Sequence, residues 1–150
     1  MVKLSLESAV AHYILGDIRP EDLPALAERA VIAGFESPAM AELAYSLNKE
    51  NEFIEKKFFN ALEELKIKKP SRIEAGLAVA REIAISIVEE RINPYEGARR
   101  IWWDVYVKIP QLKQLIPFVG MASEFEDDNN HKDDYSKMIL REARKLIAEV

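Results

Sequence analysis

Hydrophobic residues recur every three or four positions along almost the whole chain, and no segment alternates apolar and polar residues for the length of a strand. The first spacing is typical of α-helices that bury one face, whereas alternation would indicate half-buried strands. Prolines and glycines divide the pattern into separate segments. The pattern therefore predicts an all-α protein of about eight helices, over residues 4–15, 20–34, 38–47, 50–67, 71–91, 94–108, 118–127 and from 131 onward.

Start and stop signals support several of these helix boundaries. Residues 71–74 (Ser-Arg-Ile-Glu) form a capping box, in which the hydroxyl and the carboxylate satisfy backbone donors. Residues 93–94 (Asn-Pro) combine a capping side chain with a proline that the first helical turn tolerates. Gly34 can adopt the left-handed conformation that ends a helix. The helix over 71–91 has the most regular apolar spacing, so we expect it to be central to the bundle.

Length and composition agree with a folded globular chain. The protein has 150 residues, of which 49% are hydrophobic and 31% are charged. A chain of this length usually forms one domain with its own core, and this composition excludes global disorder. Since no low-complexity linker divides the sequence, we expect a single helical domain over residues 1–150.

The chain contains no cysteine. Disulfides, thiolate-bound zinc, iron–sulfur clusters and cysteine nucleophiles are therefore excluded, and the composition fits a reducing compartment. No apolar stretch reaches the roughly 20 residues of a membrane-spanning helix, and no signal-peptide pattern opens the chain. We expect a cytoplasmic protein that holds no cofactor and does not bind membranes.

The negative charge of the chain is concentrated in one place. The net charge is −5, and residues 124–134 contain six acidic side chains against one lysine, which leaves the other 139 residues neutral. A weaker basic group follows at Lys66, Lys68, Lys69 and Arg72. That group is too short and too poor in aromatic neighbours for a nucleic-acid site, and an acidic chain does not displace counterions from nucleic acid.

The acidic stretch suggests a surface that binds a basic partner protein. Clustered charge accelerates association with an oppositely charged surface and makes it depend on salt, and nearby aromatic side chains would supply apolar contact area. We expect a non-enzymatic interaction module. The candidate partner-binding residues are Glu124, Phe125, Glu126, Asp127, Asp128, Asp133, Asp134 and Trp103.

A metal-dependent or hydrolytic enzyme is the alternative. If the helix through residue 127 continued, Glu124, Asp127, Asp128 and His131 would lie on one helical face. The spacing of Asp128 and His131 is also used by carboxylate–histidine metal sites in helical bundles. Residues 129–130 (Asn-Asn), however, indicate a helix end, and a solvated acidic turn explains the same residues. No nucleophile elbow, phosphate loop or dinucleotide fingerprint occurs, so the sequence favours a non-enzymatic protein.

The aromatic cluster over residues 95–106 offers a third possibility. Neighbouring side chains on an α-helix point about 100° apart, so two adjacent indoles do not easily share one core contact. Trp102 is the better candidate for the core, and Trp103 packs against a second helix or lies at the surface. Exposed tryptophan beside tyrosine and arginine is typical of interaction hot spots. Trp103 could therefore serve a homo-oligomeric structural module, although core packing is the favoured interpretation.

Three stretches carry a resemblance. Residues 20–39, 97–102 (Gly-Ala-Arg-Arg-Ile-Trp) and 118–128 (Phe-Val-Gly-Met-Ala-Ser-Glu-Phe-Glu-Asp-Asp) resemble small uncharacterised bacterial helical proteins. The resemblance implies an all-helical bacterial protein and supplies no catalytic residues. In general type the chain is also similar to toxin-neutralising immunity proteins, which are often small, acidic and helical. This second comparison is an analogy of fold and charge, since no motif identifies a particular immunity family.

Overall fold

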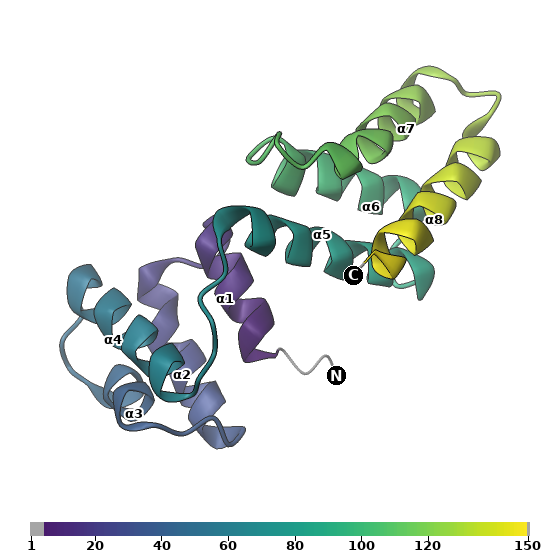
Figure 1. The fold of residues 1–150 in the computed structure, drawn as a ribbon. Coiled ribbons are helices and arrows are strands. Elements are labelled where there is room, and N and C mark those ends of the chain that lie inside the picture. Colours follow the sequence, from purple (N-terminus) through teal and green to yellow (C-terminus); the bar gives the residue numbers. More distant parts are fainter. Residues whose placement is uncertain (1–4, 150) are drawn as a thin grey trace. The chain divides into compact units, whose positions relative to one another are not determined.

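A computed structural model describes residues 5–149 of the chain, and the described residues form helices and loops without any strand (Figure 1). The predicted all-α class is confirmed, with eight α-helices among these residues. The chain divides into two compact units between Ser71 and Arg72, and each unit is described by itself. The expectation of a single domain over residues 1–150 stays a prediction.

The first unit contains four α-helices around one hydrophobic core. They are α1 (Leu6–Leu15), α2 (Leu23–Ile32), α3 (Pro38–Tyr45) and α4 (Asn51–Glu64), with a 3-10 turn at Pro20–Asp22 before α2. Every helix contributes fully buried apolar side chains, among them Val10, Leu23, Met40, Leu43, Phe58 and Leu62. The predicted left-handed cap is present at Gly34, Gly16 after α1 has a positive φ as well, and the Ser37 hydroxyl caps α3 by accepting from the Met40 N–H.

The second unit contains the other four α-helices and two shorter helical turns. Its elements are α5 (Arg72–Val88), α6 (Pro94–Arg100), a π-helix (Ile101–Tyr106), a 3-10 turn (Lys113–Leu115), α7 (Ile116–Asp127) and α8 (Lys132–Ala148). Within this unit α5 packs against α6, the π-helix and α8, which agrees with its predicted central place. Helix α8 also lies along α7 (Figure 1), and the turn between these two helices carries the acidic stretch.

The π-helix is the clearest departure from the predicted elements. A continuous α-helix was expected over residues 94–108, but the Val107 N–H donates to the Trp102 carbonyl at 3.0 Å, five residues back. Buried residues recur every four positions at Gly97, Ile101, Val105 and Ile109, and Ala98 is buried beside Gly97. Four residues of an α-helix advance by more than one turn, so such a stripe would drift around it. A π turn holds more than four residues, so within it the stripe drifts in the opposite direction, which compensates for the α-helical drift.

Two helices end at a residue in the left-handed region that is not glycine. Lys66 follows α4 with φ 59°, and Glu90 follows α5 with φ 60°. At the second position the Glu90 N–H donates to the Ile87 carbonyl and the Arg91 N–H donates to the Ser86 carbonyl. This backbone geometry ends a helix in many proteins, and glycine is the residue that adopts it without steric cost.

Replacing Glu90 with glycine should therefore stabilise the second unit. We expect Glu90→Gly to raise the free energy of unfolding by about 0.5–1 kcal/mol, because the left-handed backbone then loses its Cβ conflict. The matched control is Glu89→Gly, since the Glu89 N–H still makes a helical bond to the Ile85 carbonyl and glycine there should destabilise. Urea unfolding of both variants tests this, and equal effects would contradict it.

Among the described residues, no helix combines the length and the apolar character that crossing a bilayer requires.

Candidate functional site

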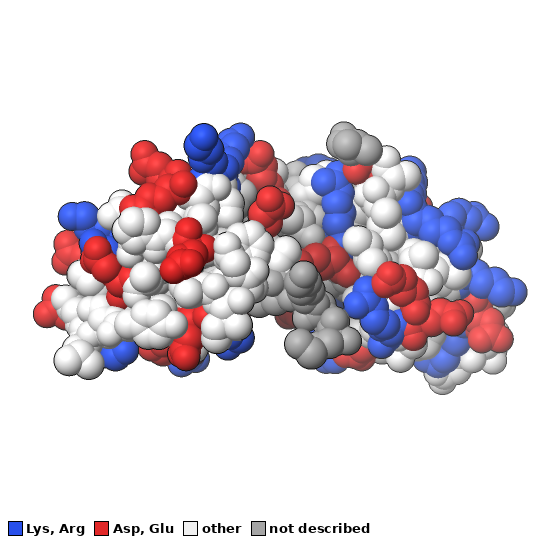
Figure 2. Space-filling view, turned by 90° about the horizontal axis from the view of Figure 1, so that it is seen from below, with Lys and Arg blue, Asp and Glu red and all other residues white. Residues whose placement is uncertain are grey.

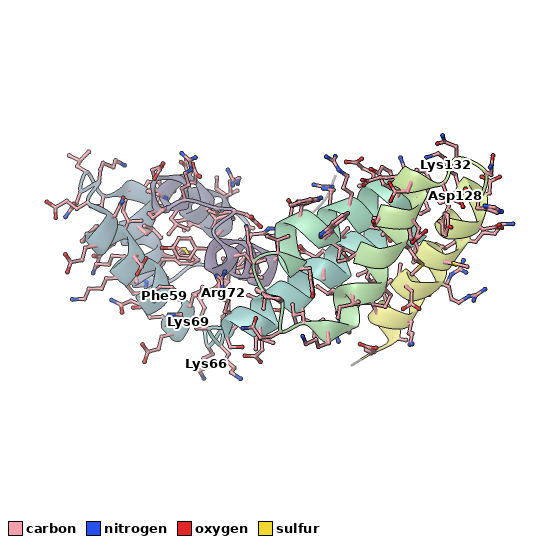
Figure 3. The ribbon with its side chains drawn as sticks, turned by 90° about the horizontal axis from the view of Figure 1, so that it is seen from above. Phe59, Lys66, Lys69, Arg72, Asp128 and Lys132 are labelled. Carbon is pink, nitrogen blue, oxygen red and sulfur yellow. The ribbon has the colours of Figure 1, made fainter. Side chains whose placement is uncertain are left out.

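The acidic segment, defined here as residues 124–134, spans the end of α7, a tight turn and the start of α8 (Figure 3). Helix α7 ends because Asp128 has an extended backbone, with φ −124° and ψ 97°. Helix α8 then begins at Lys132, with Asp133 and Asp134 in its first turn. Carboxylates at this position are favourable, because the N-terminal end of a helix carries partial positive charge.

Asp128 organises the turn between the two helices. Its Oδ1 accepts from the Asn130 N–H at 3.0 Å, and its Oδ2 lies 2.7 Å from His131 Nδ1. The Tyr135 hydroxyl donates to the same Oδ2 at 3.2 Å. The hydrogen bond with His131, followed by that from the Asn130 backbone, lowers the pKa of Asp128 below its ordinary value. Asp128 therefore stabilises the turn, and both of its carboxylate oxygens accept hydrogen bonds from within the protein.

Lys132, the one lysine of the segment, also makes its contacts within the protein. Its ammonium donates to the Phe125 carbonyl at 2.8 Å and lies 4.0 Å from the centre of the Phe125 ring. The carbonyl belongs to the last turn of α7, where helical carbonyls lack intrahelical partners and attract positive charge. Lys132 thus caps α7 and makes a cation–π contact, and among the described residues it forms no ion pair with a carboxylate.

Tyr95 of α6 fixes the other side of this helix end. Its ring stacks on the Phe125 ring with a centroid distance of 4.3 Å and an interplanar angle of 12°. Its hydroxyl donates to Glu126 Oε2 at 2.9 Å, and this hydrogen bond raises the pKa of Tyr95. Phe125 was expected to offer apolar area to a partner, but the structure shows it half-buried and already in contact with Tyr95 and Lys132.

The remaining carboxylates of the segment point their charge to solvent. Glu124, Asp127, Asp133 and Asp134 are exposed, and so is Glu126. Within residues 5–149, none of these five carboxylates forms an ion pair with a lysine or arginine. The negative charge predicted for this stretch is therefore present on the surface of the fold. Asp128 is the exception, because its carboxylate accepts hydrogen bonds within the turn.

The four residues proposed as metal ligands do not form a metal centre. Among the described residues, no three or more histidine, aspartate or glutamate side chains are grouped so that they could hold an ion. The reason is the end of α7 at Asp127, which takes His131 off the helical face shared with Glu124. Asp128 and His131 still meet through the turn, but as a hydrogen-bonded pair on one side of it.

Trp103 lies at the surface, so the favoured interpretation of it as a core residue is wrong. It is 53% exposed, whereas Trp102 is half-buried. The two indoles stack on each other with a centroid distance of 5.0 Å and an interplanar angle of 22°. The π-helix explains this contact, because its wider turn brings successive side chains closer in direction than the α-helical 100°. An exposed indole held against a second one fits the hot-spot composition expected of Trp103.

The pH dependence of the turn follows from Asp128. Because its folded pKa is lowered, its contribution to stability is complete above its ordinary value of 3.8 and disappears as the pH falls through the lower folded value. We expect an NMR titration to place the Asp128 carboxyl midpoint below 3.8. His131→Asn should move that midpoint upward, and Tyr135→Phe should move it less. A midpoint that both variants leave unchanged would contradict this account.

Comparison of the chain with protein families, with curated proteins and with solved structures found no match to any of them. The resemblance to small bacterial helical proteins and the analogy with immunity proteins therefore stay predictions.

Proposed function

We propose that this protein is a non-enzymatic interaction module that docks on a basic surface of another protein through the acidic segment. The observation that supports it is the set of exposed carboxylates at Glu124, Glu126, Asp127, Asp133 and Asp134, which lack lysine or arginine partners among residues 5–149. Charges that a protein does not satisfy internally remain free to attract an opposite charge on a partner.

The concentration of this charge is what gives it an effect at a distance. The screening length in physiological salt is about 8 Å, so carboxylates within two adjoining helical turns act together on an approaching surface. Elsewhere acids and bases balance, and Figure 2 shows Lys and Arg side chains close to Asp and Glu side chains on one face of the molecule. The acidic segment therefore supplies the direction for association, with an expected gain in the association rate.

The rigidity of the segment adds to this argument. Asp128 fixes the turn through three hydrogen bonds, and Lys132 and Tyr95 hold Phe125 at the end of α7. Binding to a loop that is already ordered costs less conformational entropy than binding that must first order the loop. Trp103, in the same unit, is the exposed aromatic side chain that we propose as an apolar contact.

A nuclease-type toxin is the partner class that we propose, in a cytoplasmic setting. Proteins that act on nucleic acids carry basic surfaces, because they must neutralise phosphates. An acidic protein that covers such a surface blocks it by occupying the place of the nucleic acid. The absence of cysteine fits a reducing compartment for this role.

The experiment is an affinity capture with charge-matched variants. The test variant carries Asp127→Asn, Asp133→Asn and Asp134→Asn, which are exposed and bear no hydrogen bond that the turn needs. We expect one partner to be captured at ~50 mM salt and released at ~500 mM. The test variant should bind the partner, identified by mass spectrometry and then purified, at least about tenfold more weakly than wild type.

A second variant removes equal charge elsewhere. It carries Glu36→Gln, Glu52→Gln and Glu63→Gln, all exposed acids outside the segment. We expect this control to retain wild-type affinity. Equal losses in the two variants, or the absence of any partner whose capture depends on salt, would overturn the proposal. Sedimentation at several concentrations identifies self-association, which would favour the homo-oligomeric alternative through Trp103.

A further inference from the structure

The first unit contains a cleft that the acidic segment has no part in. It has a volume of about 400 Å³ and lies where the end of α1, the turn before α2, the middle of α4 and the segment after α4 meet. Both aromatic and charged side chains line it, among them Tyr13, Ile18, Glu55, Phe59 and Lys69. This volume lies within the range of small-molecule sites, which combine apolar walls with a few polar groups.

Aromatic rings form one wall of the cleft and are fixed by their packing. Tyr13 and Phe59 meet edge to face with a centroid distance of 6.0 Å, and both contact the buried ring of Phe58. Because Phe58 is part of the hydrophobic core, the wall is attached to the rigid part of the unit. A ligand with an apolar or aromatic body would find a preformed surface there.

The Glu55 carboxylate lies at this wall, and a hydrogen bond from Tyr13 holds one of its oxygens. The Tyr13 hydroxyl donates to Glu55 Oε2 at 2.5 Å, and burial together with this bond raises the pKa of Tyr13, so the phenol keeps its proton. Among residues 5–149, Glu55 forms no ion pair with a lysine, arginine or histidine. The carboxylate is therefore oriented by Tyr13 and still able to accept from a cationic group.

A cation stands beside the same ring. The Lys69 ammonium lies 4.1 Å from the centre of the Phe59 ring (both labelled in Figure 3), and among the described residues it forms no ion pair. Arg19 adds a second positive charge to the lining, with Glu21 3.8 Å away from its guanidinium. The cleft thus offers a free negative and a free positive group on an aromatic wall.

We propose that this cleft binds a small zwitterion with a large apolar side chain, a free hydrophobic α-amino acid. Its ammonium would pair with Glu55, its carboxylate with Lys69, and its side chain would lie against Phe59 and Ile18. Charge-assisted hydrogen bonds at both ends fix the orientation of the ligand, and the wall supplies the apolar contact.

The charges of Glu55 and Lys69 would allow the cleft to distinguish a free amino acid from the terminal residue of a peptide. An N-terminal residue keeps the ammonium but has no carboxylate on the same residue, and a C-terminal residue has the reverse. L-phenylalaninamide and N-acetyl-L-phenylalanine reproduce these two ends. A site built for the zwitterion binds L-phenylalanine more tightly than either derivative, by about tenfold for each lost charge-assisted bond.

The test is an NMR titration of the full chain with L-phenylalanine up to ~10 mM, a range that suits millimolar affinity. We expect saturable shifts at the amides of Gly16 and Phe59. Glu55→Gln and Lys69→Gln should each weaken binding about tenfold. Glu52→Gln and Lys56→Gln, which make the same charge changes at exposed positions of α4 outside the cleft, should leave it unchanged.

Circular dichroism of each variant verifies that the helices are intact. Three results would overturn the proposal: no saturable shift with L-phenylalanine, equal affinity for either derivative, or equal effects of the cleft variants and the α4 control variants. The acidic segment takes no part in this titration, so its outcome is independent of the proposed partner binding.

Discussion

Replacing Phe118 with alanine should lower the free energy of unfolding of the second unit by about 3–5 kcal/mol. Phe118 lies on α7, and its side chain has no exposed surface. Removing the ring gives up the free energy gained by transferring it out of water. It also leaves a cavity that the close-packed neighbours fill only in part. Both tryptophans of the chain belong to this unit, so urea unfolding followed by tryptophan fluorescence measures it directly.

The control for this variant is on the same helix. Ile116 is 45% exposed, so Ile116→Ala removes a large apolar side chain that the core does not need. We expect it to cost less than about 1 kcal/mol. Similar losses for the two variants would mean that α7 is not seated on the core as the structure shows.

Much of the helical pattern could be read from the sequence, because local signals and core packing agree at most boundaries. Gly34 follows α2 in the left-handed region, and the Asn93 side chain caps α6, as the sequence predicts. The predicted helix over 50–67 extends too far, since the backbone turns left-handed at Lys66. The sequence has no glycine or asparagine there to indicate a left-handed residue. The chain adopts it because the packing of α4 outweighs the local cost.

The π-helix has only a partial signal in the sequence. The buried residues Ile101, Val105 and Ile109 are spaced by four, but the buried Ala98 lies three residues before Ile101, as in an ordinary α-helix. The 100° separation of neighbouring side chains, on which the expectation for the two indoles rests, holds only for α-helices. Trp103 lies off this buried stripe and is 53% exposed.

For the candidate site, the sequence shows which residues are charged but not which of them form bonds within the protein. Counting acids locates residues 124–134, yet the count cannot show that Asp128 serves the turn or that Lys132 serves the Phe125 carbonyl. The cleft of the first unit was not anticipated at all. Tyr13 lies on α1, Glu55 on α4 and Lys69 after α4, and the side-chain contacts of Tyr13 with Glu55 and Phe59 join the first two helices at the cleft.

Replacing Gly97 with alanine should lower the stability of the second unit by about 1–3 kcal/mol, although alanine is the better helix former. A Cβ at Gly97 would overlap the Cγ1 and Cδ1 atoms of Ile87 on α5, and Ile87 is 2% exposed. Cγ1 sits next to a branched carbon whose rotamers are few, so the side chain cannot swing aside without displacing its neighbours. The steric cost therefore exceeds the gain of up to about 1 kcal/mol in helix propensity.

Gly120 on α7 separates these two opposing effects. Apart from its two chain neighbours and the backbone of its own helix, no atom lies within 4 Å of the place where its Cβ would be, so Gly120→Ala retains only the propensity gain. We expect it to raise the free energy of unfolding by about 0.5–1 kcal/mol, as measured in the same urea experiment. Opposite signs for the two glycine variants would show that α6 closes on α5 at Gly97. A stabilising Gly97→Ala would contradict that contact, because it would leave room where the structure has none.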